Sequence, residues 1–172
     1  PLEEVFDIFV KKPVASASIG QVHSAYFNSH HVAVKIQHPG IKENVKNDIK
    51  IIRYLANLID NRIEQAKTYN LPGVVDEFER DMKKELDYAY ESNNLVRFER
   101  LLKNDGVHVP HYYKEKSTTS VLTMEYMGGL SLNALFKYDD DAFDKKAIAL
   151  EGVDSYIKQM LKSSIKIFQS FL

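Results

Sequence analysis

Apolar and polar residues alternate along the first 40 positions of the chain, a pattern typical of β-strands. We expect strands at 5–12, 19–27 and 31–37. The turn-forming Asn28-Ser29-His30 lies between the last two, and Pro39-Gly40 ends the third. These segments predict an antiparallel sheet at the start of the chain.

Apolar residues then recur at helical spacing. They predict a helix over 41–63 and, after Leu71-Pro72-Gly73, a second unbroken helix over 74–102 that ends at Asn104-Asp105-Gly106. Strand patterns return at 107–113 and 119–127. A short helix over 131–136, capped by Ser131, and a final helix bearing Ile157, Met160 and Leu161 follow. The order predicts an α+β fold with helices packed on an antiparallel sheet.

Composition and charge narrow the possible functions. The 172 residues suit one domain or part of a larger one, and 44% hydrophobic content can build a core. With 23 basic and 24 acidic residues, the chain lacks the basic surplus of a general nucleic-acid binder. The absence of cysteine excludes disulfides, zinc–thiolate sites and thiol catalysis. No targeting segment is visible, so the compartment stays open.

Lys35 is the first candidate for chemistry. In Val32-Ala33-Val34-Lys35 it shares a strand face with Ala33 and Gln37, and the small Ala33 leaves room above that face for an adenine ring. This pattern is that of the protein-kinase strand whose lysine holds nucleotide phosphates. The alternative is a surface lysine on an ordinary strand.

Three further segments extend this hypothesis. A strand–loop–strand of small residues precedes Lys35, and small side chains let backbone N–H groups approach phosphate oxygens. Glu85 and Glu91 follow on the second helix. Because they are six residues apart, their side chains point in directions about 120° apart on that helix, so they cannot face Lys35 in the same manner. Met124-Glu125-Tyr126-Met127 before two glycines has the form of an adenine-binding hinge. The alternative for the small-residue segment is an ordinary hairpin. The alternative for the glutamates is solvent-exposed acids, and for the segment before the glycines it is a core strand that ends in a turn.

Together these motifs closely resemble the UbiB/ADCK family of atypical kinases. The likeness lies in Ala15-Ser16-Ala17-Ser18-Ile19-Gly20-Gln21-Val22-His23, in Val34-Lys35-Ile36-Gln37-His38-Pro39-Gly40, and in Glu85-Leu86-Asp87-Tyr88 with Glu91 and Asn94.

The resemblance implies a protein-kinase-like N-lobe (1–129) containing inserted long helices, followed by the hinge exit and the first helices of a truncated C-lobe (130–172). It implies that Lys35 holds ATP or ADP, that Glu85 is its helical partner, and that Glu91 is a second acid near the nucleotide. Met124 would guard the adenine pocket. The remaining nucleotide contacts implied are Ala15, Ser16, Ala17, Ser18, Ile19, Gly20, Ala33, Glu125 and Met127.

The family also supports ubiquinone biosynthesis or lipid homeostasis, uses Mg²⁺ and associates with membranes, which suggests a mitochondrial, plastid or bacterial-membrane setting. Its His-x-Asp-Pro-His-Pro-Gly-Asn catalytic segment and Asp-Phe-Gly metal motif are absent from these residues. We therefore expect Mg²⁺ only with those segments, no catalytic or metal-binding residue here, and no phosphoryl transfer by these 172 residues alone. There are two alternative functions. The chain is a catalytically inactive nucleotide-binding or scaffold module, or it is a structural domain without a ligand.

Overall fold

The computed structural model describes residues 4–130, 132–137 and 143–169, and the predicted α+β fold is confirmed. Its sheet is antiparallel and five-stranded: β1 (Ile8–Phe9), β2 (Ala15–Ser16), β3 (Gly20–Phe27), β4 (His30–Gln37) and β5 (Val121–Glu125). The order is β1-β3-β4-β5, and β2 also pairs with β3. Asn28 and Ser29, both with positive φ, form the turn between β3 and β4 where the sequence predicted it.

One face of this sheet carries the main apolar core. Phe6, Ala25, Val32 and Val34 are buried there, and Ile36 packs against them from the same face of β4. Because side chains alternate along a strand, the residues between them on β4 belong to the opposite face. The core therefore fixes which way Lys35 points.

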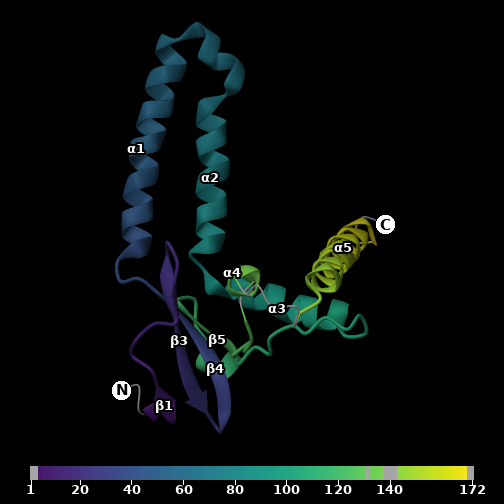
Figure 1. Ribbon diagram of the computed structural model, residues 1–172. Helices are drawn as coiled ribbons and strands as arrows, with labels where there is room; N and C mark the ends of the chain where they lie inside the picture. The colour runs from purple at the N-terminus through teal and green to yellow at the C-terminus, as the bar shows by residue number, and fades with distance from the viewer. Residues whose placement is uncertain (1–3, 131, 138–142, 170–172) are drawn as a thin grey trace.

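A helical arm projects from the sheet (Figure 1) and consists of α1 (Ile41–Arg62), the short 3-10 helix η2 (Glu64–Tyr69) and α2 (Leu71–Glu85). Ile49 and Ala56 of α1 pack against Val75 of α2 in a second, smaller core. The two helices run side by side in opposite directions, so the arm returns the chain to the sheet where it began.

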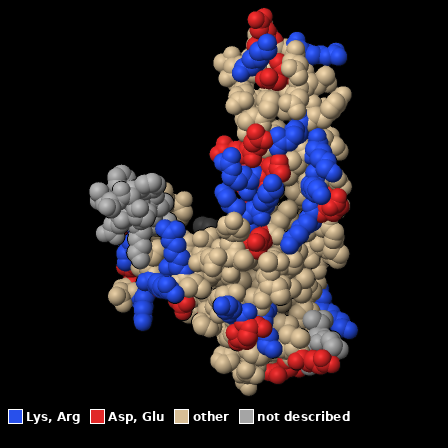
Figure 2. Space-filling model, turned by 180° about the vertical axis from the view of Figure 1, so that it is seen from behind, with Lys and Arg blue, Asp and Glu red and all other residues tan. Residues whose placement is uncertain are grey.

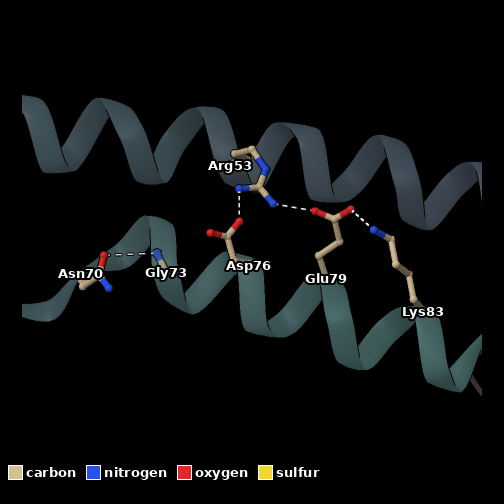
Figure 3. A network of polar contacts seen from close by, with 6 residues as sticks. All are labelled: Arg53, Asn70, Gly73, Asp76, Glu79 and Lys83. Atoms are coloured by element: carbon tan, nitrogen blue, oxygen red, sulfur yellow. Dashed lines mark hydrogen bonds and ion pairs between the residues drawn. The ribbon is translucent and has the colours of Figure 1, made fainter.

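Charged side chains join the two helices of the arm (Figure 3). Arg53 of α1 donates one hydrogen bond to Asp76 at 2.5 Å and another to Glu79 at 2.6 Å, and Lys83 contacts Glu79 at 2.7 Å. The hydrogen bonds from Lys83 and Arg53 lower the pKa of Glu79, and those to Asp76 and Glu79 raise the pKa of Arg53. The network fixes the register of α1 against α2.

The predicted continuous helix over 74–102 was wrong at both its start and its middle. Asn70 caps α2 through its side chain, which accepts from the Gly73 N–H, so Leu71-Pro72-Gly73 begins the helix instead of interrupting it. The chain then bends after Glu85, and α3 (Tyr88–Leu102) begins under an Asp87 N-cap. Apolar spacing continues across the bend, which is why periodicity alone missed it.

The remaining elements differ from expectation mainly in length. β1 is shorter than the predicted 5–12, and 107–113 forms only an isolated bridge between Tyr112 and Met124. The 3-10 helix η3 (Lys114–Lys116) precedes β5. Helices α4 (Leu132–Lys137) and α5 (Lys145–Gln169) follow; the predicted Ser131 cap and the Asp139–Asp141 turn lie outside the described residues.

Helix α5 contacts α3 through Lys162, which forms an ion pair with Asp105 and donates to the Leu101 carbonyl. Within the described ranges, no helix is both long and apolar enough to cross a membrane.

Candidate functional site

The sheet face opposite the main core brings several predicted site residues into paired rows. Lys35 of β4 lies opposite Val22 of β3 on one side and Leu122 of β5 on the other. Two residues along β4, Ala33 lies opposite Met124. Directly paired residues of antiparallel strands share a face, so Ala33 and Met124 form a small apolar surface beside Lys35.

The hairpin of small residues lies next to this surface. Ala15 of β2 pairs with Val22, which in turn pairs with Lys35, so the three form one row across the sheet. The expected loop residues are all in this hairpin: Ala15 and Ser16 in β2, Ala17, Ser18 and Ile19 in the connection, and Gly20 at the start of β3.

Hydrogen bonds hold the tip of the hairpin against the end of β4. The Ala17 N–H donates to the Gly20 carbonyl at 2.8 Å and closes the turn. His38 donates its backbone N–H to the Ile19 carbonyl at 2.9 Å, and its ring Nε2 bonds the Ala17 carbonyl at 3.2 Å. The loop is therefore fixed relative to the strand that carries Lys35.

The Lys35 side chain leaves the sheet toward α3 and forms an ion pair. Its Nζ lies 2.6 Å from Oε2 of Glu91. The two side chains are 19% and 38% exposed, so a ligand can reach the pair. The pair opens into a pocket of about 450 Å³, whose other lining residues are Lys84, Glu85, Tyr90 and Asn94.

The prediction that Glu85 pairs with Lys35 was wrong, because Glu91 occupies that position. Glu85 is the last residue of α2, and Glu91 lies in the first turn of α3. The bend between the helices removes the fixed 120° angle that a continuous helix would impose. Both acids therefore line one pocket, and Glu91 is the one that contacts the lysine.

The bend that places Glu91 is held by hydrogen bonds that two side chains and one backbone group make with the backbone around it. Asp87 caps α3 by accepting the Ala89 N–H at 3.0 Å. The Gln37 side-chain amide, buried at the end of β4, donates to the Leu86 carbonyl at 2.9 Å. The Tyr88 N–H donates to the Thr119 carbonyl at 3.0 Å. The start of α3 is thus fixed to the strand that carries Lys35.

Tyr88 lies directly beneath the ion pair. Lys35 Nζ is 4.8 Å from the centre of its ring, and the residue is 1% exposed. Its hydroxyl is buried and has no hydrogen-bond partner among the described residues. A Cβ placed on Gly20 would come within 2.7 Å of that hydroxyl, so Tyr88 also contacts the small-residue hairpin.

The unpartnered hydroxyl gives a prediction for Tyr88→Phe. A buried polar group without a partner costs about 1 kcal/mol or more, so removing it should raise the free energy of unfolding by about 1 kcal/mol at neutral pH. Urea unfolding of both proteins at pH 8 measures the difference. A variant less stable than the wild type would show that the hydroxyl has a favourable partner.

The same substitution should change the response to alkali. Burial raises the pKa of Tyr88 to about 12, and the charges of Glu91 and Glu85 contribute. In the unfolded chain Tyr88 ionises near its ordinary pKa of about 10. The stability linked to the raised pKa in the folded protein is therefore fully present below pH 10 and is lost as the pH rises toward 12. Tyr88→Phe should lose less stability than the wild type between pH 8 and 11. Equal losses would contradict the assignment.

The predicted hinge lies at the end of β5. The Glu125 carboxylate accepts from the His111 N–H at 3.2 Å and contacts His108 Nε2 at 2.9 Å, and these bonds, the backbone one first, lower its pKa. Met127 is exposed beyond the strand. The Glu125 side chain thus anchors the segment before β5. The contacts of Glu125 and Met127 with a nucleotide stay predictions.

Tyr88 and Val22 stand in the motifs that carry the family resemblance, but sequence reasoning gave neither of them a role in the site. Had Asp87 been recognised as an N-cap, the spacing of Tyr88, Glu91 and Asn94 would have placed all three on one face of a new helix. No three His, Asp or Glu side chains of the described ranges lie together as metal ligands do.

The sequence model of one protein family, the ABC1 atypical kinase-like domain, matches residues 1–170. The chain belongs to this family. Its relatives include the protein ACTIVITY OF BC1 COMPLEX KINASE 8, chloroplastic, of Arabidopsis thaliana, 35% identical over 93% of this chain, and the probable protein kinase UbiB of Cronobacter sakazakii, 31% identical over 95%. The resemblance to UbiB/ADCK proteins is confirmed.

A solved structure of the same kind supports the fold. A Mycobacterium tuberculosis protein, determined in complex with erythromycin, superposes with a TM-score of 0.69 at 33% identity and covers 80% of this chain. The chain corresponds to 21% and 31% of the lengths of the Arabidopsis and Cronobacter relatives and to 34% of the mycobacterial chain. It is therefore comparable with only a part of each of these three proteins.

Proposed function

We propose that this chain binds ATP or ADP and supplies the phosphate-holding lysine of an atypical kinase or ATPase. The observation that carries the proposal is the Lys35–Glu91 ion pair, 2.6 Å long and open to a pocket of about 450 Å³. A cation held by a carboxylate keeps its position while its remaining N–H groups stay available to phosphate oxygens. Membership of the ABC1 atypical kinase-like family supports the assignment of nucleotide phosphates as the ligand of this lysine.

The neighbouring residues suit the other parts of a nucleotide. Ala33, Val22 and Met124 offer a small apolar surface on which an adenine ring could rest. The hairpin around Ala17 presents backbone close to Lys35 because its side chains are small. Mg²⁺ in such sites is bound by one or two carboxylates together with the substrate phosphates, so we propose that its protein ligands belong to the catalytic and metal-binding segments that are absent from these residues.

Equilibrium binding tests the proposal directly. A ligand that binds only the folded protein stabilises it by about 2.7 kcal/mol at a concentration of 100 times its Kd. We expect ATP or ADP with Mg²⁺ to raise the melting temperature in a saturable way and to bind with one-to-one stoichiometry in calorimetry. Inorganic phosphate at equal concentration is the control, and an unchanged melting temperature with every nucleotide would refute the proposal.

Catalysis and cellular role are a further step of the proposal. Phosphoryl transfer by the complete protein, a part in ubiquinone biosynthesis or lipid homeostasis, and a membrane-associated partner complex remain predictions from the family resemblance. The Arabidopsis relative is chloroplastic by name and the Cronobacter relative is bacterial, which supports a plastid or bacterial setting as a proposal.

A further inference from the structure

A second pocket lies at the base of the arm and shares no lining residue with the pocket beside Lys35. Its volume is about 560 Å³, within the range of small-molecule sites. Val45 and Ile49 of α1, Met82 of α2 and Leu86, which directly follows α2, give it an apolar lining between the two helices. We name it the arm pocket.

Basic side chains surround this apolar lining. Five basic and two acidic residues line the arm pocket, whereas the whole chain has 23 basic and 24 acidic residues. Lys42, Lys46 and Lys50 are four residues apart on α1, so they lie on one helix face at steps of about 6 Å. Figure 2 shows Lys and Arg side chains gathered over the lower half of the arm.

The three lysines of α1 form weaker or fewer ion pairs with acidic residues of the protein than Arg53 and Lys83 do. Arg53 and Lys83 are both bonded to Glu79 within the arm. Lys46 is 4.0 Å from Glu43, with both side chains about two-thirds exposed, and such surface pairs contribute little. Lys50 bonds the neutral Asn47, and Lys42 has no ion pair within the part of the chain that the structure describes. Their charge is available to a ligand.

We propose that the arm pocket binds a single-chain amphiphile with an anionic head group. The chain lies along the apolar floor between Ile49 and Met82, and the head group contacts the row of Lys42, Lys46 and Lys50. A small inorganic anion would leave the floor unused, and a neutral apolar molecule would leave the lysines unpaired. Only a ligand with both parts matches both features.

Alkyl phosphates of different lengths, kept below their micelle concentrations, test the proposal by titration calorimetry. Each additional buried methylene should tighten binding about fourfold, so decyl phosphate should bind about 15 times more tightly than octyl phosphate. Decyl glucoside has the same chain and a neutral head, and it should bind about tenfold more weakly than decyl phosphate. Equal affinity for inorganic phosphate and decyl phosphate, or for glucoside and phosphate, would overturn the proposal.

Variants assign the binding to this pocket. The triple change Lys42→Gln, Lys46→Gln and Lys50→Gln affects exposed side chains and should weaken decyl phosphate binding at least about tenfold. A matched triple change of the exposed Lys11, Lys12 and Lys67, which lie outside the pocket, should leave the affinity unchanged. Lys35→Met should also leave it unchanged, which separates this site from the proposed nucleotide site. An affinity equal to wild type in the first triple variant would place the ligand elsewhere.

Discussion

Lys35→Met is expected to weaken ATP binding by about 10- to 100-fold. Hydrogen bonds to charged groups contribute about 1.5–3 kcal/mol, and each 1.4 kcal/mol is about a factor of ten in affinity. Met is unbranched and only one heavy atom shorter than Lys, and it removes the ammonium group that Glu91 holds at 2.6 Å. Because Glu91 is 38% exposed, water can solvate its carboxylate after the change, and the fold should survive.

Calorimetric titration of ATP with Mg²⁺ into the wild type and the variant measures this loss. Lys67→Met is the matched control, because Lys67 is an exposed lysine in η2 at the far end of the arm. Circular dichroism and urea unfolding establish that each variant is folded. If Lys35→Met binds ATP as well as the wild type does, the nucleotide site lies away from Lys35. A wild type that binds no nucleotide refutes the proposed function itself.

Gly20→Ala is expected to lower the free energy of unfolding by about 2–3 kcal/mol, the cost of overpacking a tight contact. A Cβ at Gly20 would lie 2.5 Å from the Ile36 carbonyl oxygen and 2.7 Å from the Tyr88 hydroxyl. The first neighbour is backbone in the central strand β4, so it cannot move without disturbing the sheet. The small-residue hairpin therefore needs glycine here for close approach.

Gly128→Ala provides the matched control for this prediction. A Cβ at Gly128 would meet nothing within 4 Å, so its cost should stay within about 0.5 kcal/mol. In a Tyr88→Phe background, Gly20→Ala should cost less than in the wild type but more than nothing, since the Ile36 carbonyl remains. Urea unfolding of the four proteins in that cycle and of Gly128→Ala measures these differences, and equal costs for Gly20→Ala and Gly128→Ala would contradict the predicted contact.

Much of the sheet could be predicted from sequence because strand alternation is a local property. The pattern around Val32 and Val34 identified the buried face of β4, and this placed Lys35, Ala33 and Gln37 together on the other face. The turn at Asn28 and Ser29 followed from residue chemistry as well.

The partner of Lys35 could not be found in the same way. Its identity depends on the bend between α2 and α3, which is stabilised by a contact across 49 residues from Gln37 to the Leu86 carbonyl. Apolar periodicity continues through that bend and hides it, although Asp87 was a visible N-cap candidate. The Tyr88 hydroxyl and its approach to Gly20 are likewise tertiary features.

The hydrogen bond from Gln37 to the Leu86 carbonyl also explains how this domain can tolerate changes in the length of its helical arm. It brings together the last residue of β4, which precedes the arm, and the residue just after the arm, so residues 41–85 form an insertion whose two ends lie close together. Whole helical turns can be added to or removed from both α1 and α2 beyond the Arg53 network without altering the distance between β4 and α3. The size of the arm and the spacing of Lys35 from Glu91 can therefore vary independently within this architecture.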